Sequence, residues 1–283
     1  MKYIKIPLII TIILAFSNLS FAQKMKPEEI ITKHLDSIGT PQVRTSIKSQ
    51  IAVGDAVVKF ISQKNLTAQG RIVLASSADK FFWGLKLNAI DYSTEKFSFD
   101  GKKAKVAIVR NGVRSILGNF VLSNNSILEE SLLGGVLSTS WALSNMTNKK
   151  AKLSFEGEKK IDGKEVYVLG YSPKSGADIS INLFFDKETF QHIRTEYKRV
   201  SSAAVGRTID ESARQSETRL KLTEDFSDFK MINGLVLPHN YRLLYTTTGQ
   251  NGTTEIEWNF LLNQFAVNQN LDEKTFDAEA VLQ

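Results

Sequence analysis

The side chains of this sequence that could carry acid–base chemistry are three histidines and a few pairs of neighbouring acids. His34, His192 and His239 stand far apart, and none has the spacing of a His-Glu-x-x-His metal site. No Gly-x-Ser-x-Gly elbow offers a nucleophilic serine. Acid pairs such as Glu129 and Glu130 stand at expected helix starts, where they favour the helix dipole. We therefore expect a non-enzymatic protein with partly exposed histidines, no metal and no cofactor, although distant residues could still assemble a triad.

Cysteine is absent from the sequence. Its absence excludes disulfides, thiolate metal sites, a cysteine nucleophile and the lipid-bearing cysteine of bacterial lipoproteins. The chain is therefore expected to be unlipidated and to depend on its hydrophobic core for stability.

The amino terminus has the pattern of a cleavable secretory signal. Lys2 and Lys5 precede an apolar run at 6–16, and Ala22 ends the stretch expected before the cleavage site. The run has about 11 residues, whereas a membrane-spanning helix takes roughly 20. We expect removal of residues 1–22 and a soluble, periplasmic chain in which residues 23–283 form a single domain.

The composition is that of a folded protein, with 42% hydrophobic and 23% charged residues. Removing residues 1–22 takes away two lysines and no acids, so the formal net charge falls from +6 to +4. The remaining lysines cluster beside turn residues without the interleaved aromatics of a nucleic-acid surface. We expect no nucleic-acid partner, and transient contact with a membrane surface or a membrane protein stays open. The oligomeric state is not predicted.

An opening helix and a long series of strands organise the rest of the chain. Pro27 and Gly39 bound the helix, which presents Ile30, Leu35 and Ile38 on one side. From about residue 47 onward the apolar period is two, and Asp-Gly and Asn-Gly turns join the strands. About ten such strands exceed what a flat sheet tolerates, so we expect a mainly β (α+β) fold whose antiparallel sheet curls into a barrel, a partial barrel or a sandwich.

Large side chains stand on the apolar face of several expected strands. On a curled sheet they either line a ligand cavity or fill the core. The candidate cavity residues are Phe81, Trp83, Leu85, Ile181, Leu183, Tyr197, Phe226, Tyr241, Leu243 and Trp258.

Residues 125–146, here called the lid segment, break the strand pattern and predict a pair of helices. Two adjacent glycines in its middle lower helix stability by roughly 2 kcal/mol relative to alanine. The segment is either a hinged cover that swings aside, in which case alanines at the glycines slow ligand exchange, or a fixed helix that ends at Gly134 and is followed by a second, short helix. The candidate lid residues are Leu132, Leu133, Gly134, Gly135, Val136, Leu137 and Trp141. The polar stretch at 201–218 is either a long hairpin tip or a mobile loop.

Several blocks of the sequence carry a family resemblance. They are EGEKKIDGKEVYVLGYSPKSGADISINLFFDKETFQHIRTEYK at 156–198, FKMINGLVLPHNYRL at 229–243, NQNLDEKTFD at 268–277 and the opening helix that ends in SIGT. Together they resemble the periplasmic lipoprotein-carrier superfamily of LolA and LolB, an outer-membrane lipoprotein-sorting fold. The resemblance implies an incomplete antiparallel β-barrel, covered by the N-terminal helix and a helical lid, that holds a lipid in an apolar cavity. It assigns no individual site residue, since neither Arg44 nor Arg71 stands in a motif that aligns with the shuttles' lid-closing arginine.

Three functions remain open on the sequence. The first is an exported carrier that binds a lipid or the acyl chains of a lipoprotein, for transport across the periplasm to the outer membrane. The second is a lipid-sensing module of an envelope regulatory system that uses the same pocket. The third is an exported hydrolase, which requires a clustered serine, histidine and acid.

Overall fold

The structure is a computed structural model and describes residues 25–63, 66–109, 112–146, 150–174, 176, 178–203, 217–250 and 252–279. The predicted signal at 1–22 lies outside these residues, as does most of the predicted polar loop at 201–218. No helix in the described part combines the length and the apolar character needed to cross a bilayer.

Helices are few and short, and most of the described chain is strand. The helices are α1 (Pro27–Ile38), α2 (Pro41–Ser46), α3 (Ile116–Ser123), α4 (Ser126–Glu129) and the 3-10 helices η1 (Gly135–Leu137), η2 (Ala142–Asn145) and η3 (Glu273–Phe276). The strands are β1 (Ser49–Phe60), β2 (Leu66–Ser77), β3 (Lys80–Leu87), β4 (Thr94–Phe99), β5 (Ala104–Val106), β6 (Lys152–Ile161), β7 (Lys164–Ser172), β8 (Ser180–Asp186), β9 (His192–Ser201), β10 (Thr218–Ile232), β11 (Leu235–Gly249) and β12 (Gly252–Val267).

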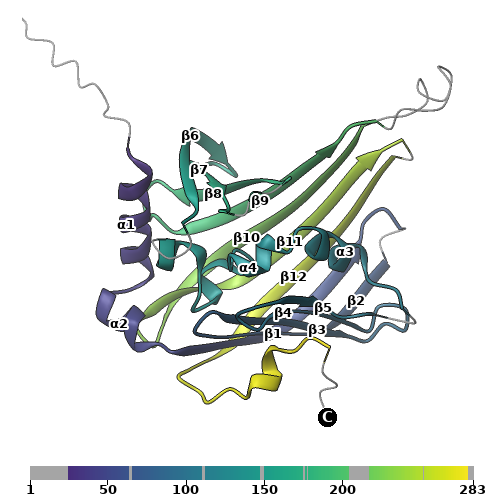
Figure 1. Ribbon diagram of the computed structural model, residues 1–283, viewed down its shortest axis with the longest axis horizontal. Coiled ribbons are helices and arrows are strands. Elements are labelled where there is room, and N and C mark those ends of the chain that lie inside the picture. The colour runs from purple at the N-terminus through teal and green to yellow at the C-terminus, as the bar shows by residue number, and fades with distance from the viewer. Residues whose placement is uncertain are drawn as a thin grey trace, which may run out of the picture.

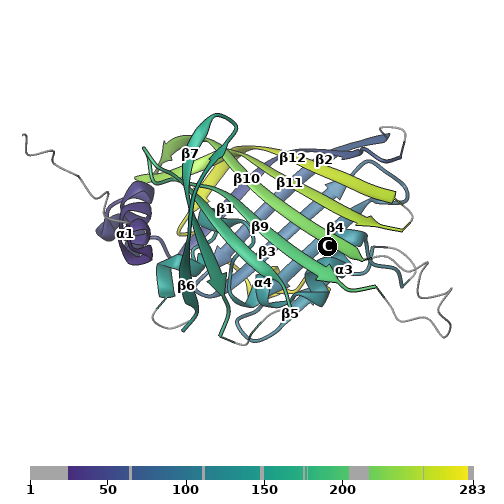
Figure 2. The ribbon, with the colours of Figure 1, turned by 90° about the horizontal axis from the view of Figure 1, so that it is seen from above.

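The described strands form one antiparallel sheet of twelve, in the order β5-β4-β3-β2-β1-β12-β11-β10-β9-β8-β7-β6. The sheet curls without closing, because no pairing among the described residues joins its edge strands β5 and β6. In Figures 1 and 2, α1 stands at one end of the sheet and the short helices α3 and α4 lie within its curve. The predicted incomplete barrel, covered by an N-terminal helix and a mid-chain segment, is therefore confirmed.

Local sequence explains the hairpins and the opening helix. Asn233 and Gly234 both have positive φ, 51° and 83°, and join the long strands β10 and β11 in the tight turn that such pairs favour. Asp162 and Gly163 do the same between β6 and β7. The predicted stripe of α1 packs on the core, with Ile30 fully buried.

The lid segment is not the pair of helices predicted from its apolar spacing. Helix α4 has four residues, and the chain continues through turns into the short helices η1 and η2. Gly134 and Gly135 have φ of 80° and 51°, the left-handed conformation that ends a helix. The glycine pair therefore forms a turn and not the interior of a helix, and alanine there is strained rather than stiffening. Helix α3, directly before the lid segment, is an element that the sequence analysis misses.

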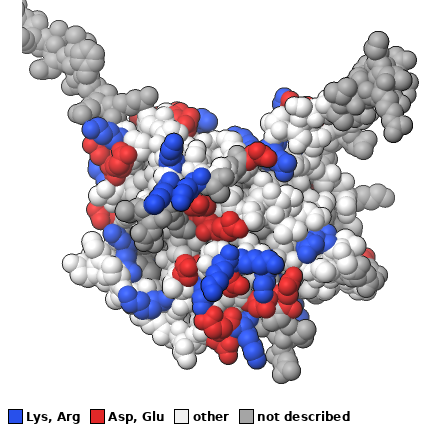
Figure 3. Space-filling view, in the orientation of Figure 1, with Lys and Arg blue, Asp and Glu red and all other residues white. Residues whose placement is uncertain are grey.

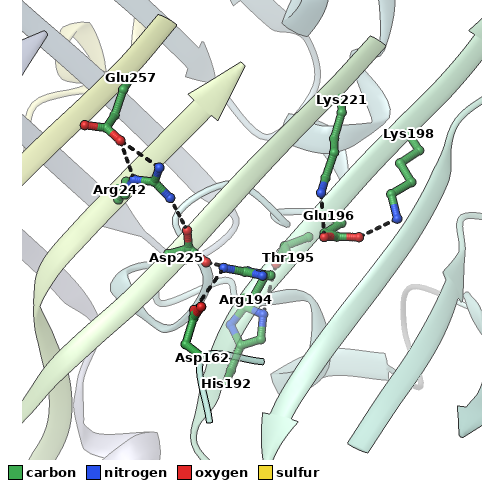
Figure 4. A network of polar contacts seen from close by, with 10 residues as sticks. All are labelled: Asp162, His192, Arg194, Thr195, Glu196, Lys198, Lys221, Asp225, Arg242 and Glu257. Atoms are coloured by element: carbon green, nitrogen blue, oxygen red, sulfur yellow. Dashed lines mark hydrogen bonds and ion pairs between the residues drawn. The ribbon is translucent and has the colours of Figure 1, made fainter. Parts of the chain in front are cut away.

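Charged side chains of both signs are interspersed on the face of the molecule that Figure 3 shows. A ladder of alternating charge crosses neighbouring strands: Arg194 of β9 and Arg242 of β11 both contact Asp225 of β10, at 2.5 and 2.8 Å. Arg242 continues to Glu257 of β12 at 2.6 Å (Figure 4). Each such pair contributes roughly 0.2–1 kcal/mol. Because opposed charges alternate across the strands, the ladder favours the register that turns the apolar residues inward.

Gly70 lies where two strands come too close for a side chain. A Cβ at Gly70 would stand 1.8 Å from the Lys86 carbonyl oxygen on β3. We expect Gly70→Ala to lower the free energy of unfolding by about 2–3 kcal/mol in urea denaturation, because the strands must shift. Gly249→Ala is the matched control, since its Cβ would meet Thr218 at 3.4 Å, an ordinary contact. An equal loss in both variants would contradict this reading of the sheet.

Candidate functional site

The ten candidate cavity residues converge on the inner face of the sheet. They come from β3, β8, β9, β10, β11 and β12, and each is at most 2% exposed. All ten belong to one hydrophobic cluster, which also contains Leu132, Leu133, Val136, Leu137 and Trp141 of the lid segment. The structure thus brings together the residues that the sequence singles out. Their role in binding a ligand stays a prediction.

Aromatic rings form a continuous path across this inner face. Trp83 contacts Phe260 with ring centroids 5.7 Å apart, and Phe260 contacts Tyr241 at 5.3 Å. Tyr241 stacks on Phe226 at 5.2 Å, with only 6° between the ring planes. Phe226 contacts His192 at 5.0 Å, and that ring reaches Trp141 of the lid segment at 4.8 Å. Flat rings on a curved sheet make a floor on which an extended apolar chain can lie.

Single hydrogen bonds tie the lid segment to elements on both sides of the curl. Thr139 donates its N–H to the Ser76 hydroxyl of β2 at 2.9 Å, and Trp141 donates Nε1–H to His34 of α1 at 3.0 Å. Tyr171 of β7 donates its hydroxyl to Glu130 at 2.8 Å. A segment with so little helix of its own is held in place by these contacts and by its buried side chains.

A carboxyl group stands at the centre of the inner face. Glu224 is fully buried, and its Oε1 accepts from the Gly134 N–H of the lid segment at 2.9 Å and from the Tyr241 hydroxyl at 2.7 Å. Its Oε2 accepts from the Tyr197 hydroxyl at 3.1 Å. Burial raises the pKa of Glu224 to about 7, while these three hydrogen bonds act in the opposite direction. Two residues predicted to line the cavity are therefore partners of an acid that the sequence analysis misses.

A second inward carboxyl, Glu95 of β4, is 1% exposed. It accepts hydrogen bonds from the Tyr92 hydroxyl and, at 2.5 Å, from the Ser115 hydroxyl that also caps α3. Tyr92 in turn accepts from the Trp258 indole N–H at 3.1 Å. Burial raises the pKa of Glu95 to about 7, against these hydrogen bonds. The inner face therefore holds two carboxyl groups that are close to half-protonated near neutral pH.

Two histidines predicted to be partly exposed are instead buried. His34 is 1% exposed and bonds to the Phe190 carbonyl, and His192 is 0% exposed and bonds to the Thr195 hydroxyl at 2.9 Å. A β-bulge between β8 and β9 brings His192 opposite Phe185, in the core cluster. Burial lowers the pKa of His34 to about 4 and that of His192 well below its usual range. Both rings are therefore neutral parts of the core at pH 7.

The hydrogen bonds of the three histidine rings differ from those of a Ser-His-Asp hydrolase site. In the described residues, the imidazoles of His34, His192 and His239 bond to carbonyls, to Trp141 and to Thr195, and none is bonded to a serine hydroxyl or a carboxylate. Nor does the described part of the chain bring three His, Asp or Glu side chains together as metal ligands.

Hollows adjoin the lid segment at the end of the sheet near α2. One has a volume of about 50 Å³ and is lined by Arg44, Gln50, Val136 and Trp141 among others. A larger hollow of about 570 Å³ shares Arg44, Thr139 and Ser144 with it and is lined by both polar and apolar side chains. Ligand pockets usually measure 300–1,000 Å³ and are mainly apolar.

An open, curled antiparallel sheet whose inner face is covered by short helices is the fold of this chain. Similar solved structures include a LolA superfamily protein from Nitrosomonas europaea, 16% identical over 89% of this chain and 98% of its own, with a TM-score of 0.48. A DUF1329 family protein from Desulfovibrio piger is 12% identical over 88% of this chain and 96% of its own, with a TM-score of 0.40. A putative outer membrane lipoprotein-sorting protein domain from Vibrio parahaemolyticus is 14% identical over 87% of this chain and 97% of its own, with a TM-score of 0.39. The LolA-like resemblance that the motifs predict is confirmed, at identities that carry no argument about function. No protein-family model and no curated protein sequence matches the chain.

Strain at Gly135 offers a test of the cover. The backbone of Gly135 has φ of 51°, and a Cβ added to it would stand 3.0 Å from His192 Nδ1 and 3.2 Å from Phe226. Left-handed backbone costs a residue with a Cβ about 1–2 kcal/mol. We expect Gly135→Ala to loosen the closed lid segment and to speed uptake of a fluorescent hydrophobic probe about 5- to 30-fold in stopped flow. This is the reverse of the slower exchange predicted for a helical hinge.

The matched control for that variant is Gly163→Ala. Gly163 also has positive φ, 86°, but it lies in the β6–β7 turn with nothing within 4 Å of an added Cβ. Its substitution strains the backbone without touching the lid segment, so uptake should stay at the wild-type rate. Equal acceleration in both variants would show a general loss of stability instead of lid opening.

Proposed function

We propose that this chain is an exported, non-catalytic carrier that binds a lipid or the acyl chains of a lipoprotein on the inner face of its curled sheet. Residues 23–283 act as one domain, and residues 1–22 direct its export to the periplasm. The observation that carries the proposal is the aromatic floor, which is closed by the lid segment rather than by a second layer of regular structure. Such a cover can be displaced without unfolding the sheet.

Binding follows from the apolar surface that opening exposes. The floor and the underside of the lid segment are both apolar, so an open lid in water leaves both faces unfavourably hydrated. Acyl chains restore the burial, at roughly 25 cal/mol for each Å² of apolar surface removed from water. The ligand therefore stabilises the open arrangement in proportion to its apolar surface, and specificity for chain length follows from the length of the floor. Delivery across the periplasm to the outer membrane is the role that such a carrier serves.

Extraction of the protein purified from its native envelope tests the proposal. We expect organic extraction and mass spectrometry to recover lipid in stoichiometric amount. Delipidated protein should in turn bind a fluorescent fatty-acyl probe with saturation at one equivalent. A protein that comes out ligand-free, and that binds neither hydrophobic probes nor lipid, would rule the carrier out.

A further inference from the structure

The inner face carries acidic groups without buried cationic groups to pair with them in the described part of the chain. Apart from tyrosines, its buried ionisable side chains in the described part of the chain are Glu95, Glu224, His34 and His192, and the two histidines are neutral at pH 7. Among the described residues, no lysine or arginine is buried. Arg44, beside the hollow at the end of the sheet, already donates to the Leu35 and Gly39 carbonyls. An anionic head placed on the floor would therefore meet carboxyl groups and no free cation.

The closed lid segment presents to Glu224 the kind of group that the carboxyl prefers. The Gly134 N–H donates to Oε1 at 2.9 Å, beside the Tyr241 hydroxyl. When the lid segment moves, this acceptor loses one donor and stays in an apolar setting, where an unsatisfied group is costly. A ligand with its own N–H or O–H group restores the hydrogen bond.

Two buried polar atoms near this contact have no hydrogen-bond partner in the described structure, Trp83 Nε1 and His192 Nδ1. Trp83 lies beside Tyr241: burial raises the pKa of the Tyr241 hydroxyl, and the Trp83 side chain lowers it by a smaller amount. The Trp83 indole N–H makes no hydrogen bond of ordinary geometry. His192 Nδ1 would be 3.0 Å from a Cβ on Gly135. The Trp83 indole N–H can therefore donate a hydrogen bond to an acceptor such as a carbonyl oxygen.

We propose that the inner face selects acyl lipids whose head is a neutral amide, with its N–H donated to Glu224 and its carbonyl accepting from Trp83, over free fatty-acid anions. The inference rests on the proposed function and names its ligand class. An amide matches the site because it carries one donor and one acceptor side by side, and because it brings no charge into the apolar interior. A carboxylate offers acceptors alone and adds a negative charge beside Glu224.

Two probes with the same acyl chain test this selection, N-palmitoylethanolamine and sodium palmitate. Their affinities are measured at pH 8 by displacement of a bound fluorescent hydrophobic probe, below the concentrations at which either lipid aggregates. We expect wild-type protein to bind the amide at least tenfold more tightly. Glu224→Gln should raise the affinity for palmitate relative to that for the amide at least tenfold, because glutamine removes the negative charge and keeps an acceptor.

Glu196→Gln is the matched control. Glu196 lies on β9, pairs with Lys198 and Lys221 on the outer face, and stands opposite Thr223, the neighbour of Glu224 (Figure 4). This variant should leave both affinities unchanged. If Glu224→Gln does not fold, Trp83→Phe provides the second test: it keeps an aromatic ring, removes the N–H, and should lower the ratio of amide affinity to palmitate affinity about fivefold.

The outcomes separate this inference from the proposed function. If neither probe displaces the fluorophore, the carrier function fails, and the selection fails with it. If palmitate binds as tightly as the amide in wild-type protein, or if Glu224→Gln leaves their ratio unchanged, the carrier stands and the selection is wrong. If Arg44→Gln abolishes tight palmitate binding, the head lies at the end of the sheet and not on the floor, which also overturns the inference.

Discussion

Oxidation of a Ser76→Cys/Thr139→Cys variant is expected to stop lipid uptake. The Thr139 N–H lies 2.9 Å from the Ser76 hydroxyl, so cysteines at the two positions are within reach of each other. The resulting disulfide fixes the lid segment to β2 and keeps the aromatic floor covered. We expect the oxidised variant to take up a fluorescent hydrophobic probe at least 100-fold more slowly than the reduced one, and dithiothreitol to restore the rate. The native chain has no cysteine, so no other thiol competes.

A disulfide far from the lid segment controls for general stiffening. Thr248 and Thr253 face each other in the β11–β12 hairpin, with their hydroxyls 3.1 Å apart. Oxidised Thr248→Cys/Thr253→Cys protein should take up the probe at the wild-type rate, and oxidation should not slow uptake by either single variant at positions 76 and 139. Uptake by the oxidised Ser76→Cys/Thr139→Cys protein at the reduced rate would show that ligands reach the floor without lid movement.

The strands and the face they bury are predictable because a period of two leaves little choice. Trp83 and Leu85 on β3, or Ile181 and Leu183 on β8, alternate with polar residues, and each set is buried as predicted. Hairpin turns are equally local, as Asn233-Gly234 shows. The prediction for the lid segment is wrong, because its apolar spacing fits a helix whereas its backbone follows the shape of the surface that it covers. Sequence periodicity describes an element's own geometry and contains nothing about the shape of a partner surface.

The alternation of residues along a strand could have predicted that the two carboxyl groups point inward. Leu222, Glu224 and Phe226 occupy alternate positions of β10, so the glutamate shares the face of two buried apolar residues. Glu95 stands in the same relation to Phe97 on β4. A carboxyl at an inward position is a candidate functional residue, because burying it costs free energy. Its tyrosine partners are not predictable, since they depend on the register between strands far apart in sequence.

These buried carboxyls make stability depend on pH in a direction opposite to that of most acids. The pKa of Glu224 is about 7 in the folded chain against an ordinary value of 4.5, so the folded state binds this proton more tightly than the unfolded state. The free energy of unfolding therefore rises as pH falls through 7, and the gain is complete near pH 4.5. This difference between the two pKa values changes the free energy of unfolding by about 3 kcal/mol.

The buried histidines oppose this gain in wild-type protein. The pKa of His34 is lowered to about 4 and that of His192 lies well below its usual range, so the unfolded chain binds their protons first. Their contribution to stability is lost as pH falls below 6.5. Glu95, with its pKa also raised to about 7, acts in the same direction as Glu224. The four groups offset one another, so the wild-type curve alone conceals them and a single-residue variant is needed.

Comparison of Glu224→Gln with wild type isolates one of the four groups. Glutamine never ionises, so it avoids the cost of a buried charge above pH 7. We expect the stability of the variant relative to wild type to be higher at pH 8 than at pH 5 by about 2.5 kcal/mol, measured by urea unfolding at both values. Glu196→Gln is again the control: ion pairs with Lys198 and Lys221 keep the pKa of Glu196 low despite its partial burial, so its difference from wild type should stay constant over this range. A constant difference for Glu224→Gln would instead mean that water reaches Glu224, and that the floor is open before any ligand arrives.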